Sequence, residues 1–214
     1  MIRAFLFDLD GTLTNTLQDI ADAMNRALRL HGLPEWPLDA YRYLVGNGAK
    51  KLAERAVSEH QELAVSVQQT YQEYYQTHSL VTTKPYEDIP ELLHALQDRG
   101  IRLAVFSNKP DADTKKVVAH FFPDIQWAAV RGQVEGVPVK PDPAGALAVA
   151  GCLGAAPEEI LYAGDTATDM QCAIAAGMQP AGVLWGFRTA EELTANGARY
   201  LAAQPMDLLT LADL

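Results

Sequence analysis

Apolar and polar residues follow two different periods along this chain, and the change of period divides it into regions. Ala4-Phe5-Leu6 is a continuous apolar run that a turn at Gly11 closes, and this pattern predicts a short buried strand. Between residues 17 and 31 the apolar positions recur every three or four residues. We therefore expect a helix there, with Thr16 and Asp19 as its N-terminal cap.

Helical spacing continues after this segment, and no strand pattern appears between residues 15 and 81. The apolar positions predict helices over residues 38–45, 49–58 and 63–77. Pro34, Pro37 and the sequence Gly46-Asn47-Gly48 interrupt the pattern, because proline and glycine disfavour the interior of a helix. The region is therefore predicted to be an all-helical unit.

After residue 84, strand-like and helix-like segments alternate. Strands are predicted over residues 101–106, 127–130, 160–163 and 181–185, and helices over residues 89–98, 113–120, 144–153 and 169–176. Such alternation is typical of a parallel sheet with right-handed crossovers. We expect an α/β fold with a Rossmann-like parallel-sheet core made of residues 1–14 and 82–214. Residues 15–81 would form an insert after the first strand.

The composition restricts the possible partners. Of the 214 residues, 49% are hydrophobic and 21% are charged, which is ordinary for a globular protein. A net charge of −10 argues against a nucleic-acid partner, since a phosphate backbone requires a basic protein face. The chain has two cysteines, no apolar stretch long enough to cross a membrane and no signal-peptide pattern. We therefore expect a cytoplasmic protein with no membrane partner.

Two carboxylates lie at the C-terminal end of the first predicted strand. Asp8 and Asp10 are two positions apart, which places both side chains on one face of an extended segment. Carboxylates this close repel one another unless a cation or a shared proton compensates them, and Mg²⁺ prefers such oxygen ligands. A lone Asp-x-Asp pair is also compatible with a solvated acidic turn, so the pair alone leaves both interpretations open.

Polar residues also follow two of the other predicted strands. Ser107-Asn108-Lys109 ends one strand, Asp165 and Asp169 follow another, and Lys140 lies between them in a Lys-Pro-Asp-Pro sequence. Ligands bind at the carboxyl edge of parallel strands, so these residues are expected to meet the acid pair. Separately, Ser-Asn-Lys is typical of a turn and Lys-Pro-Asp-Pro of a helix start. Together and in this order, the segments resemble the four motifs of the haloacid dehalogenase superfamily of phosphohydrolases.

The resemblance implies a covalent phosphatase mechanism acting on a small phosphorylated metabolite. Asp8 is expected to be the nucleophile that forms an aspartyl-phosphate, and Asp10 to protonate the leaving group and then activate water. Lys140 is expected to balance the charge of the phosphate and of Asp8. Ser107 and the backbone of Asn108 would donate hydrogen bonds to the phosphoryl oxygens.

The resemblance also implies a magnesium site. Mg²⁺ is expected to bind the carboxylate of Asp8, the backbone carbonyl of Asp10 and the carboxylate of Asp165. Waters and a phosphate oxygen would complete its shell. Asp169 is expected to orient a metal-bound water or Lys140 rather than to bind the ion itself.

Residues 15–81 resemble the helical-bundle cap domain of the family. The sequence Leu44-Val45-Gly46-Asn47-Gly48-Ala49 and residues 182–188 resemble the phosphoglycolate phosphatases within it, which implies 2-phosphoglycolate as the substrate. Backbone N–H groups at Gly46, Asn47 and Gly48, just before a helix, are expected to bind the substrate carboxylate. The same loop is also compatible with a simple turn between two helices.

Other functions remain compatible with these residues. A sugar-phosphate mutase of the same superfamily would share the core residues and differ in the cap, and a pyrophosphatase is a further alternative. A phosphonate hydrolase requires a cap lysine, for which Lys50 and Lys51 are candidates. A non-catalytic phosphate-sensing protein would need neither a nucleophile nor an acid, so Asp8 and Asp10 argue against it. The sequence does not determine the oligomeric state.

Overall fold

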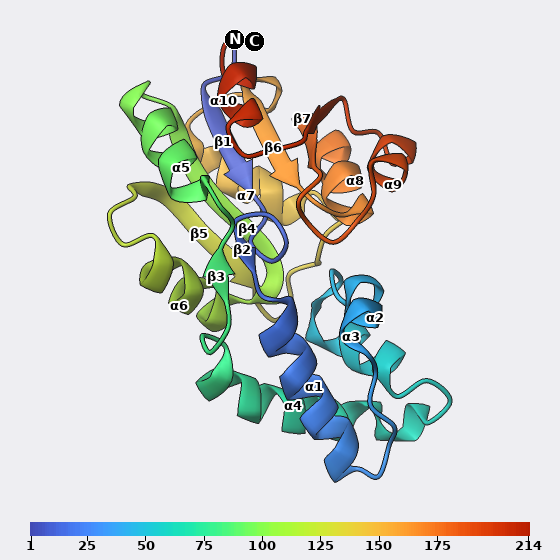
Figure 1. The fold of residues 1–214 in the computed structure, drawn as a ribbon. Coiled ribbons are helices and arrows are strands. Elements are labelled where there is room, and N and C mark those ends of the chain that lie inside the picture. The colour runs from blue at the N-terminus through green and yellow to red at the C-terminus, as the bar shows by residue number, and fades with distance from the viewer.

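In the computed structural model, which describes residues 1–214, a six-stranded sheet forms the centre of the molecule (Figure 1). The strand order is β5-β4-β1-β6-β7-β8, and every neighbouring pair is parallel. The strands are β1 (Ala4–Phe7), β4 (Arg102–Pro110), β5 (Trp127–Gln133), β6 (Ile160–Gly164), β7 (Gln179–Val183) and β8 (Tyr200–Ala202). The order reverses beside β1, and ligands bind at such a switch point. The predicted α/β fold is confirmed.

Helices cover both faces of the sheet, because its central strands carry apolar side chains on both sides. Phe5 and Phe7 of β1 face one helical layer, and Ala4 and Leu6 face the other. The first layer contains α5 (Ile89–Asp98), α6 (Asp111–Phe121) and α10 (Asp207–Leu211). The second contains α7 (Ala144–Leu153) and α8 (Ala167–Ala175), with α9 (Ala190–Ala195) beside α8.

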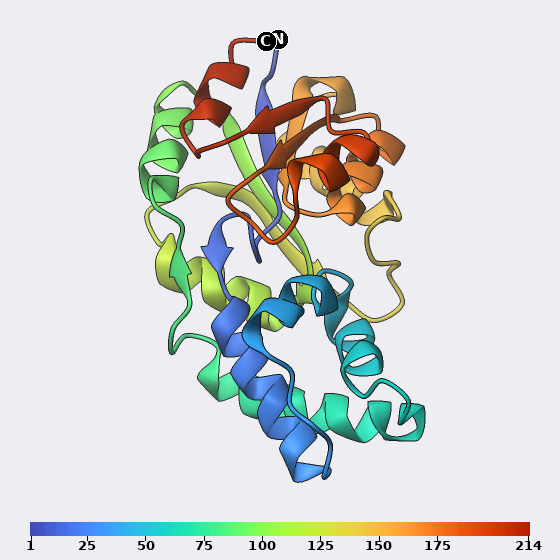
Figure 2. The ribbon, with the colours of Figure 1, turned by 45° about the vertical axis from the view of Figure 1, so that its right-hand side comes forward.

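The helical insert, which we call the cap, forms a separate layer at one end of the sheet (Figures 1 and 2). It contains α1 (Leu17–Leu30), α2 (Leu38–Leu44), α3 (Gly48–Ala56), the short 3₁₀ helix η1 (Gln61–Leu63) and α4 (Ala64–His78). These helices bury an apolar cluster of their own, and one core residue, Phe187, belongs to that cluster. Both chain termini lie at the opposite end of the sheet.

Two chain segments connect the cap to the core, and they pair with one another. β2 (Thr14–Asn15) and β3 (Lys84–Pro85) form a two-stranded antiparallel ribbon. The side chain of Asn15 accepts a hydrogen bond from Leu17 N at 3.3 Å, at the start of α1. The ribbon was not predicted, because strands of two residues carry no periodic pattern.

The predicted N-terminal cap of α1 is wrong. Thr16 occupies the cap position, but its side chain accepts no hydrogen bond from the helix. Asp19 instead accepts hydrogen bonds from the backbone N–H groups of Val81, Thr82 and Thr83 and from both threonine hydroxyls, at 2.5–3.1 Å. Asp19 is only 3% exposed. It therefore ties α1 to the segment that leads back to the core.

The sequence patterns also missed the last elements of the chain. α9, β8 and α10 each span six residues or fewer, which is too short for a period to be recognised. β4 is longer than predicted, because it continues through Ser107 to Pro110. No helix has the length and apolar character needed to cross a membrane.

Candidate active site

The motif segments converge at the carboxyl edge of the sheet, next to the cap. Asp8 follows β1, Ser107 lies in the last part of β4, and Asp165 follows β6. Gly11 allows the segment that follows β1 to pack closely against Asp165. Its φ is +89°, and a Cβ there would lie 2.3 Å from a carboxylate oxygen of Asp165. A glycine is therefore required at this position both for its backbone conformation and for space.

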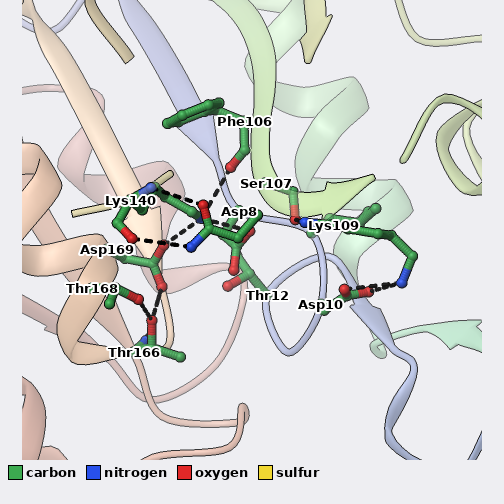
Figure 3. Close-up of polar contacts among 12 residues, drawn as sticks. Asp8, Asp10, Thr12, Phe106, Ser107, Lys109, Lys140, Thr166, Thr168 and Asp169 are labelled. Carbon is green, nitrogen blue, oxygen red and sulfur yellow. Dashed lines mark hydrogen bonds and ion pairs between the residues drawn. The ribbon is translucent and has the colours of Figure 1, made fainter. Parts of the chain in front are cut away.

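Lys140 is the centre of a buried charge network (Figure 3). Its Nζ lies 2.8 Å from Asp8 Oδ1 and 2.7 Å from Asp169 Oδ1, and it donates to the carbonyl of Phe106 at 3.1 Å. Lys140 is 1% exposed. The side chain of Asn108 positions the backbone of Lys140. It accepts a hydrogen bond from Lys140 N at 2.8 Å and donates one to Lys140 O at 3.2 Å. The structure thus brings several predicted site residues into one network.

Burial and neighbouring charges change the protonation of this network. Burial raises the pKa of Asp8 to about 7, with the Lys140 ammonium opposing the rise and Asp169 adding to it. Burial also acts to lower the pKa of Lys140, but Asp169 and Asp8 outweigh it and raise that pKa well above its usual value. Lys140 is therefore a permanent cation beside Asp8 at neutral pH.

Asp169 has both carboxylate oxygens bonded within the protein. Oδ1 pairs with Lys140, while Oδ2 accepts hydrogen bonds from Thr166 N at 3.0 Å and from the Thr166 hydroxyl at 2.6 Å. Thr166 precedes α8 and Asp169 is the third residue of that helix, so the Asp169 carboxylate reaches back to the residue before the helix, as the third residue of a capping box does. The helix start therefore fixes the carboxylate that holds Lys140.

Asp165 is a buried carboxylate that forms no ion pair. It is fully buried, and it accepts hydrogen bonds from the Thr12 hydroxyl at 3.2 Å and from Phe187 N at 2.8 Å. Burial raises its pKa well above the usual value, and the carboxylates of Asp169 and Asp8 raise it further. One oxygen from each of these three aspartates lies within 4.8 Å of the others. Buried carboxylates this close require compensation, so the donor set fits a divalent cation such as Mg²⁺.

Asp10 has a partner that the sequence analysis did not assign. Lys109 Nζ lies 2.8 and 3.0 Å from the two carboxylate oxygens of Asp10 (Figure 3). It also donates to the hydroxyl of the cap residue Tyr75 at 2.8 Å. Burial acts to lower the pKa of Lys109, but Asp10 outweighs it and raises that pKa. The Asp10 side chain thus lies outside the three-aspartate cluster, which leaves its backbone carbonyl for the expected metal contact. In the sequence, only the position of Lys109 directly after Ser107-Asn108 indicated that it could belong to the site.

A small cavity of about 50 Å³ lies between this edge of the sheet and the cap. Its lining residues from the core are Asp8, Asp10, Ser107, Asn108, Lys109, Pro110 and Phe187, and those from the cap are Ile20, Val45, Gly46, Gly48, Ala49, Leu52 and Tyr71. The core therefore supplies the charged groups of the cavity, and the cap supplies a mainly apolar wall with two glycines.

The cap loop reaches this cavity through Gly46 and Gly48 but not through Asn47. Asn108 Nδ2 donates to Gly46 O at 3.1 Å, and Gly48 begins α3 with a φ of +81°. The Asn47 side chain makes no capping bond to α3, because its Oδ1 accepts a hydrogen bond from Arg55 Nη2 at 2.6 Å. The first N–H groups of α3 are thus left without a side-chain cap.

Comparison with known proteins agrees with this geometry. Residues 5–183 match the family model described as haloacid dehalogenase-like hydrolase. A phosphoglycolate phosphatase from Aquifex aeolicus (strain VF5) is 32% identical over 99% of this chain and 97% of its own length. An N-acetylmuramic acid 6-phosphate phosphatase from Pseudomonas aeruginosa is 31% identical over 99% of this chain and 95% of its own. The crystal structure of a predicted phosphoglycolate phosphatase from Haemophilus somnus 129PT, at 27% identity, has a TM-score of 0.90 over 98% of this chain and 97% of that one. This chain therefore belongs to the haloacid dehalogenase-like hydrolase family.

Proposed function

We propose that this phosphatase depends on Mg²⁺ and hydrolyses a small phosphomonoester through an aspartyl-phosphate on Asp8, with 2-phosphoglycolate as its preferred substrate. The observation that best supports the proposal is the placement of Asp8, which lines the cavity with Lys140 2.8 Å away and belongs to the three-aspartate cluster. Lys140 and a metal ion in the three-aspartate cluster would offset the negative charge of the phosphoryl group. The Asp8 carboxylate could therefore approach and attack it.

Mg²⁺ would be held by the carboxylates of Asp8 and Asp165 and by the backbone carbonyl of Asp10. When bound, it supplies positive charge to the phosphoryl oxygens and polarises the bonds at phosphorus. Asp165 suits this role, because it is buried and forms no ion pair with the protein. Asp169 would orient Lys140 instead, because its charge is already paired with the Lys140 ammonium at 2.7 Å, whereas Asp165 forms no ion pair.

In the first step, an oxygen of Asp8 attacks phosphorus while the bond from phosphorus to the ester oxygen breaks. This step starts with Asp10 in its carboxylic acid form, which the second step regenerates, and the departing oxygen takes that proton. Lys140 and the hydroxyl of Ser107 stabilise charge on the phosphoryl oxygens. The Ser107 oxygen accepts a hydrogen bond from the backbone N–H of Lys109 at 3.3 Å. This bond does not use the hydroxyl hydrogen, which can therefore be donated to a phosphoryl oxygen.

In the second step, water attacks phosphorus and the bond from phosphorus to Asp8 breaks. Asp10 takes a proton from the attacking water, and inorganic phosphate leaves. Lys109 bonds both oxygens of Asp10 and so holds this carboxylate in place for the proton transfer. Asp8 is restored, so atoms and charges balance over the two steps.

The size and polarity of the cavity favour a very small anionic substrate. Its volume of about 50 Å³ leaves little enclosed space beside Asp8 and Ser107 while the cap is docked. A carboxylate would meet the uncapped N–H groups and the positive dipole end of α3. These features support 2-phosphoglycolate, the substrate in the name of the A. aeolicus relative, over the larger amino-sugar phosphate of the P. aeruginosa relative.

The positions of the cap lysines argue against a phosphonate hydrolase. Lys50 and Lys51 are both exposed, neither lines the cavity, and Lys51 pairs with Glu54 at 2.6 Å. A sugar-phosphate mutase or a pyrophosphatase would use the same core residues, so a comparison of substrates decides between these activities. A phosphate-sensing protein would hydrolyse none of the substrates.

The test is the release of inorganic phosphate from a substrate set that includes 2-phosphoglycolate, N-acetylmuramic acid 6-phosphate, a hexose phosphate and pyrophosphate. We expect 2-phosphoglycolate to give the highest kcat/KM, and we expect EDTA to abolish activity and Mg²⁺ to restore it. Asp8→Asn should retain the fold by circular dichroism and lose nearly all turnover, because an amide is a poor nucleophile. Full activity after exhaustive chelation, or substantial turnover by Asp8→Asn, would contradict the mechanism. A higher kcat/KM for a larger substrate would contradict the substrate assignment alone.

A further inference from the structure

The loop of residues 185–188, which follows β7 and precedes α9, contacts the cap and a proposed metal ligand at the same time. On the cap side, Arg42 of α2 donates to Gly186 O at 3.1 Å, and Arg188 donates to Val45 O at 3.2 Å. Between these two contacts lies Phe187, which is 4% exposed and is the only core residue in the apolar cluster of the cap. Three consecutive loop residues therefore meet the docked cap.

The same loop positions Asp165. Phe187 N donates to Asp165 Oδ2 at 2.8 Å. Gly186 lies so close that a Cβ there would be 2.3 Å from Asp165 Cβ. The Trp185 indole donates to the carbonyl of Thr12 at 2.9 Å, and the Thr12 hydroxyl donates to Asp165 Oδ1 at 3.2 Å. Both carboxylate oxygens are thus held by the loop itself or by a residue that the loop binds.

We propose that docking of the cap on the 185–188 loop positions Asp165 for Mg²⁺, so that cap docking and metal binding strengthen one another. Phe187 is the positioning residue, because its ring belongs to the cap cluster while its N–H holds the metal ligand. The packed side chain restrains the Cα of Phe187, and that Cα is bonded to the nitrogen whose N–H holds Asp165. Coupling between two sites is reciprocal, so bound Mg²⁺ stabilises the docked cap by the same factor. The inference rests on the proposed metal role of Asp165.

The first test compares Mg²⁺ binding to the wild-type protein and to Phe187→Ala by isothermal titration calorimetry, without substrate. The alanine variant keeps the backbone N–H but removes the ring from the cap cluster. We expect its Kd for Mg²⁺ to rise about five- to 150-fold, which is the usual range for coupling between sites. Phe187→Leu keeps an apolar side chain in the cluster and is expected to bind Mg²⁺ within about threefold of wild type.

Hydrogen exchange measures the reciprocal effect. In the wild-type protein, Mg²⁺ is expected to slow amide exchange in the cap loop at residues 45–48, whereas in Phe187→Ala it should not. Arg42→Gln loses only the contact of an exposed side chain with Gly186 O. It is therefore expected to weaken Mg²⁺ binding in the same direction as Phe187→Ala but by a smaller factor.

Lys116→Met is the matched control. Lys116 of α6 also joins the core to the cap, donating to Gln76 O at 2.6 Å and to the Ser79 hydroxyl at 3.1 Å. It lies on the β4–β5 side of the sheet, whereas the 185–188 loop follows β7 on the other side. Its loss is expected to leave the Kd for Mg²⁺ unchanged, and an effect as large as that of Phe187→Ala would show general damage to the cap and overturn the inference.

Equal Kd values for the wild-type protein and a folded Phe187→Ala would likewise overturn the coupling. If Phe187→Ala does not fold, Arg42→Gln decides the question, and an unchanged Kd for that variant overturns the inference. If the wild-type protein hydrolyses substrate and all variants have the same Kd for Mg²⁺, the coupling alone is contradicted. Failure of the wild-type protein to bind Mg²⁺ would overturn the proposed function and the inference together.

Discussion

Substitution of Asp19 by asparagine tests whether one carboxylate holds the connection between cap and core. Asp19 accepts hydrogen bonds from three backbone N–H groups and two hydroxyls, which belong to Val81, Thr82 and Thr83. Asparagine has nearly the same size, but its NH₂ group replaces one acceptor oxygen and cannot accept from these donors. Of the five donors, one loses its only acceptor if the NH₂ replaces Oδ1 and three do so if it replaces Oδ2, in a site where the side chain is 3% exposed.

The expected loss of stability follows from those hydrogen bonds. A hydrogen bond to a charged group contributes about 1.5–3 kcal/mol, and a buried donor left without an acceptor costs about 1–3 kcal/mol. The hydroxyls can turn to other acceptors, whereas the backbone N–H groups cannot. We therefore expect the free energy of unfolding to fall by about 3 kcal/mol. For a chain of this size Tm changes by about 2–4 °C per kcal/mol, so the expected decrease is about 6–12 °C.

The effect has a definite dependence on pH. Burial acts to raise the pKa of Asp19, but the hydrogen bonds from Thr82 and Thr83 outweigh it and lower the pKa below its usual value. A carboxylate with a lowered pKa in the folded state contributes stability above its unfolded pKa, about 3.9, and loses it as pH falls through the folded pKa. The stability difference between wild type and Asp19→Asn is therefore expected to be complete at neutral pH and to shrink in acid.

Urea unfolding at pH 7 and at stepwise lower pH, followed by circular dichroism, measures this difference. Asp22→Asn is the matched control, because Asp22 is an exposed carboxylate on the same helix that accepts a hydrogen bond from Gln18 at 2.7 Å. Its effect is expected to stay within about 0.5 kcal/mol. A loss below about 1 kcal/mol for Asp19→Asn at pH 7, or a difference that does not shrink in acid, would refute the reasoning.

Three further predictions concern the active site. Lys109→Met is expected to lower kcat for 2-phosphoglycolate at least about tenfold, because the Asp10 carboxylate loses the cation that holds it. Single-turnover kinetics should place the loss in hydrolysis of the aspartyl-phosphate. An unchanged kcat would remove Lys109 from this role. Asp165→Ala should raise the Mg²⁺ concentration required for activity far more than Asp169→Ala, and Mg²⁺ titrations that give the opposite order would reverse the two assignments. Arg55→Met releases Asn47, which can then cap α3 and compete with the substrate carboxylate. It is expected to lower kcat/KM for 2-phosphoglycolate but not for p-nitrophenyl phosphate, and the additional change Asn47→Ala should restore it; parallel losses for both substrates would contradict the carboxylate-binding role of α3.

The sequence by itself determined the fold class and the positions of the site residues along the chain. The apolar runs and the helical spacing depend on neighbouring residues, so they can be recognised locally. Parallel strands with right-handed crossovers place their carboxyl ends at one edge. Asp8 and Asp165 each follow such a strand, and they were therefore expected to meet although more than 150 residues separate them.

Only the tertiary structure decided which groups touch. Lys109 is adjacent to Asn108 in the chain, but its partners Asp10 and Tyr75 lie after another strand and in the cap. Asp19 occupies a position from which it could complete a helix cap, yet the connecting segment offers it several buried donors, and these must be satisfied. Such contacts depend on how the cap packs against the core, and no local period records that arrangement. The same reason applies to Phe187, which is one apolar residue in the sequence and a contact between cap and metal ligand in the fold.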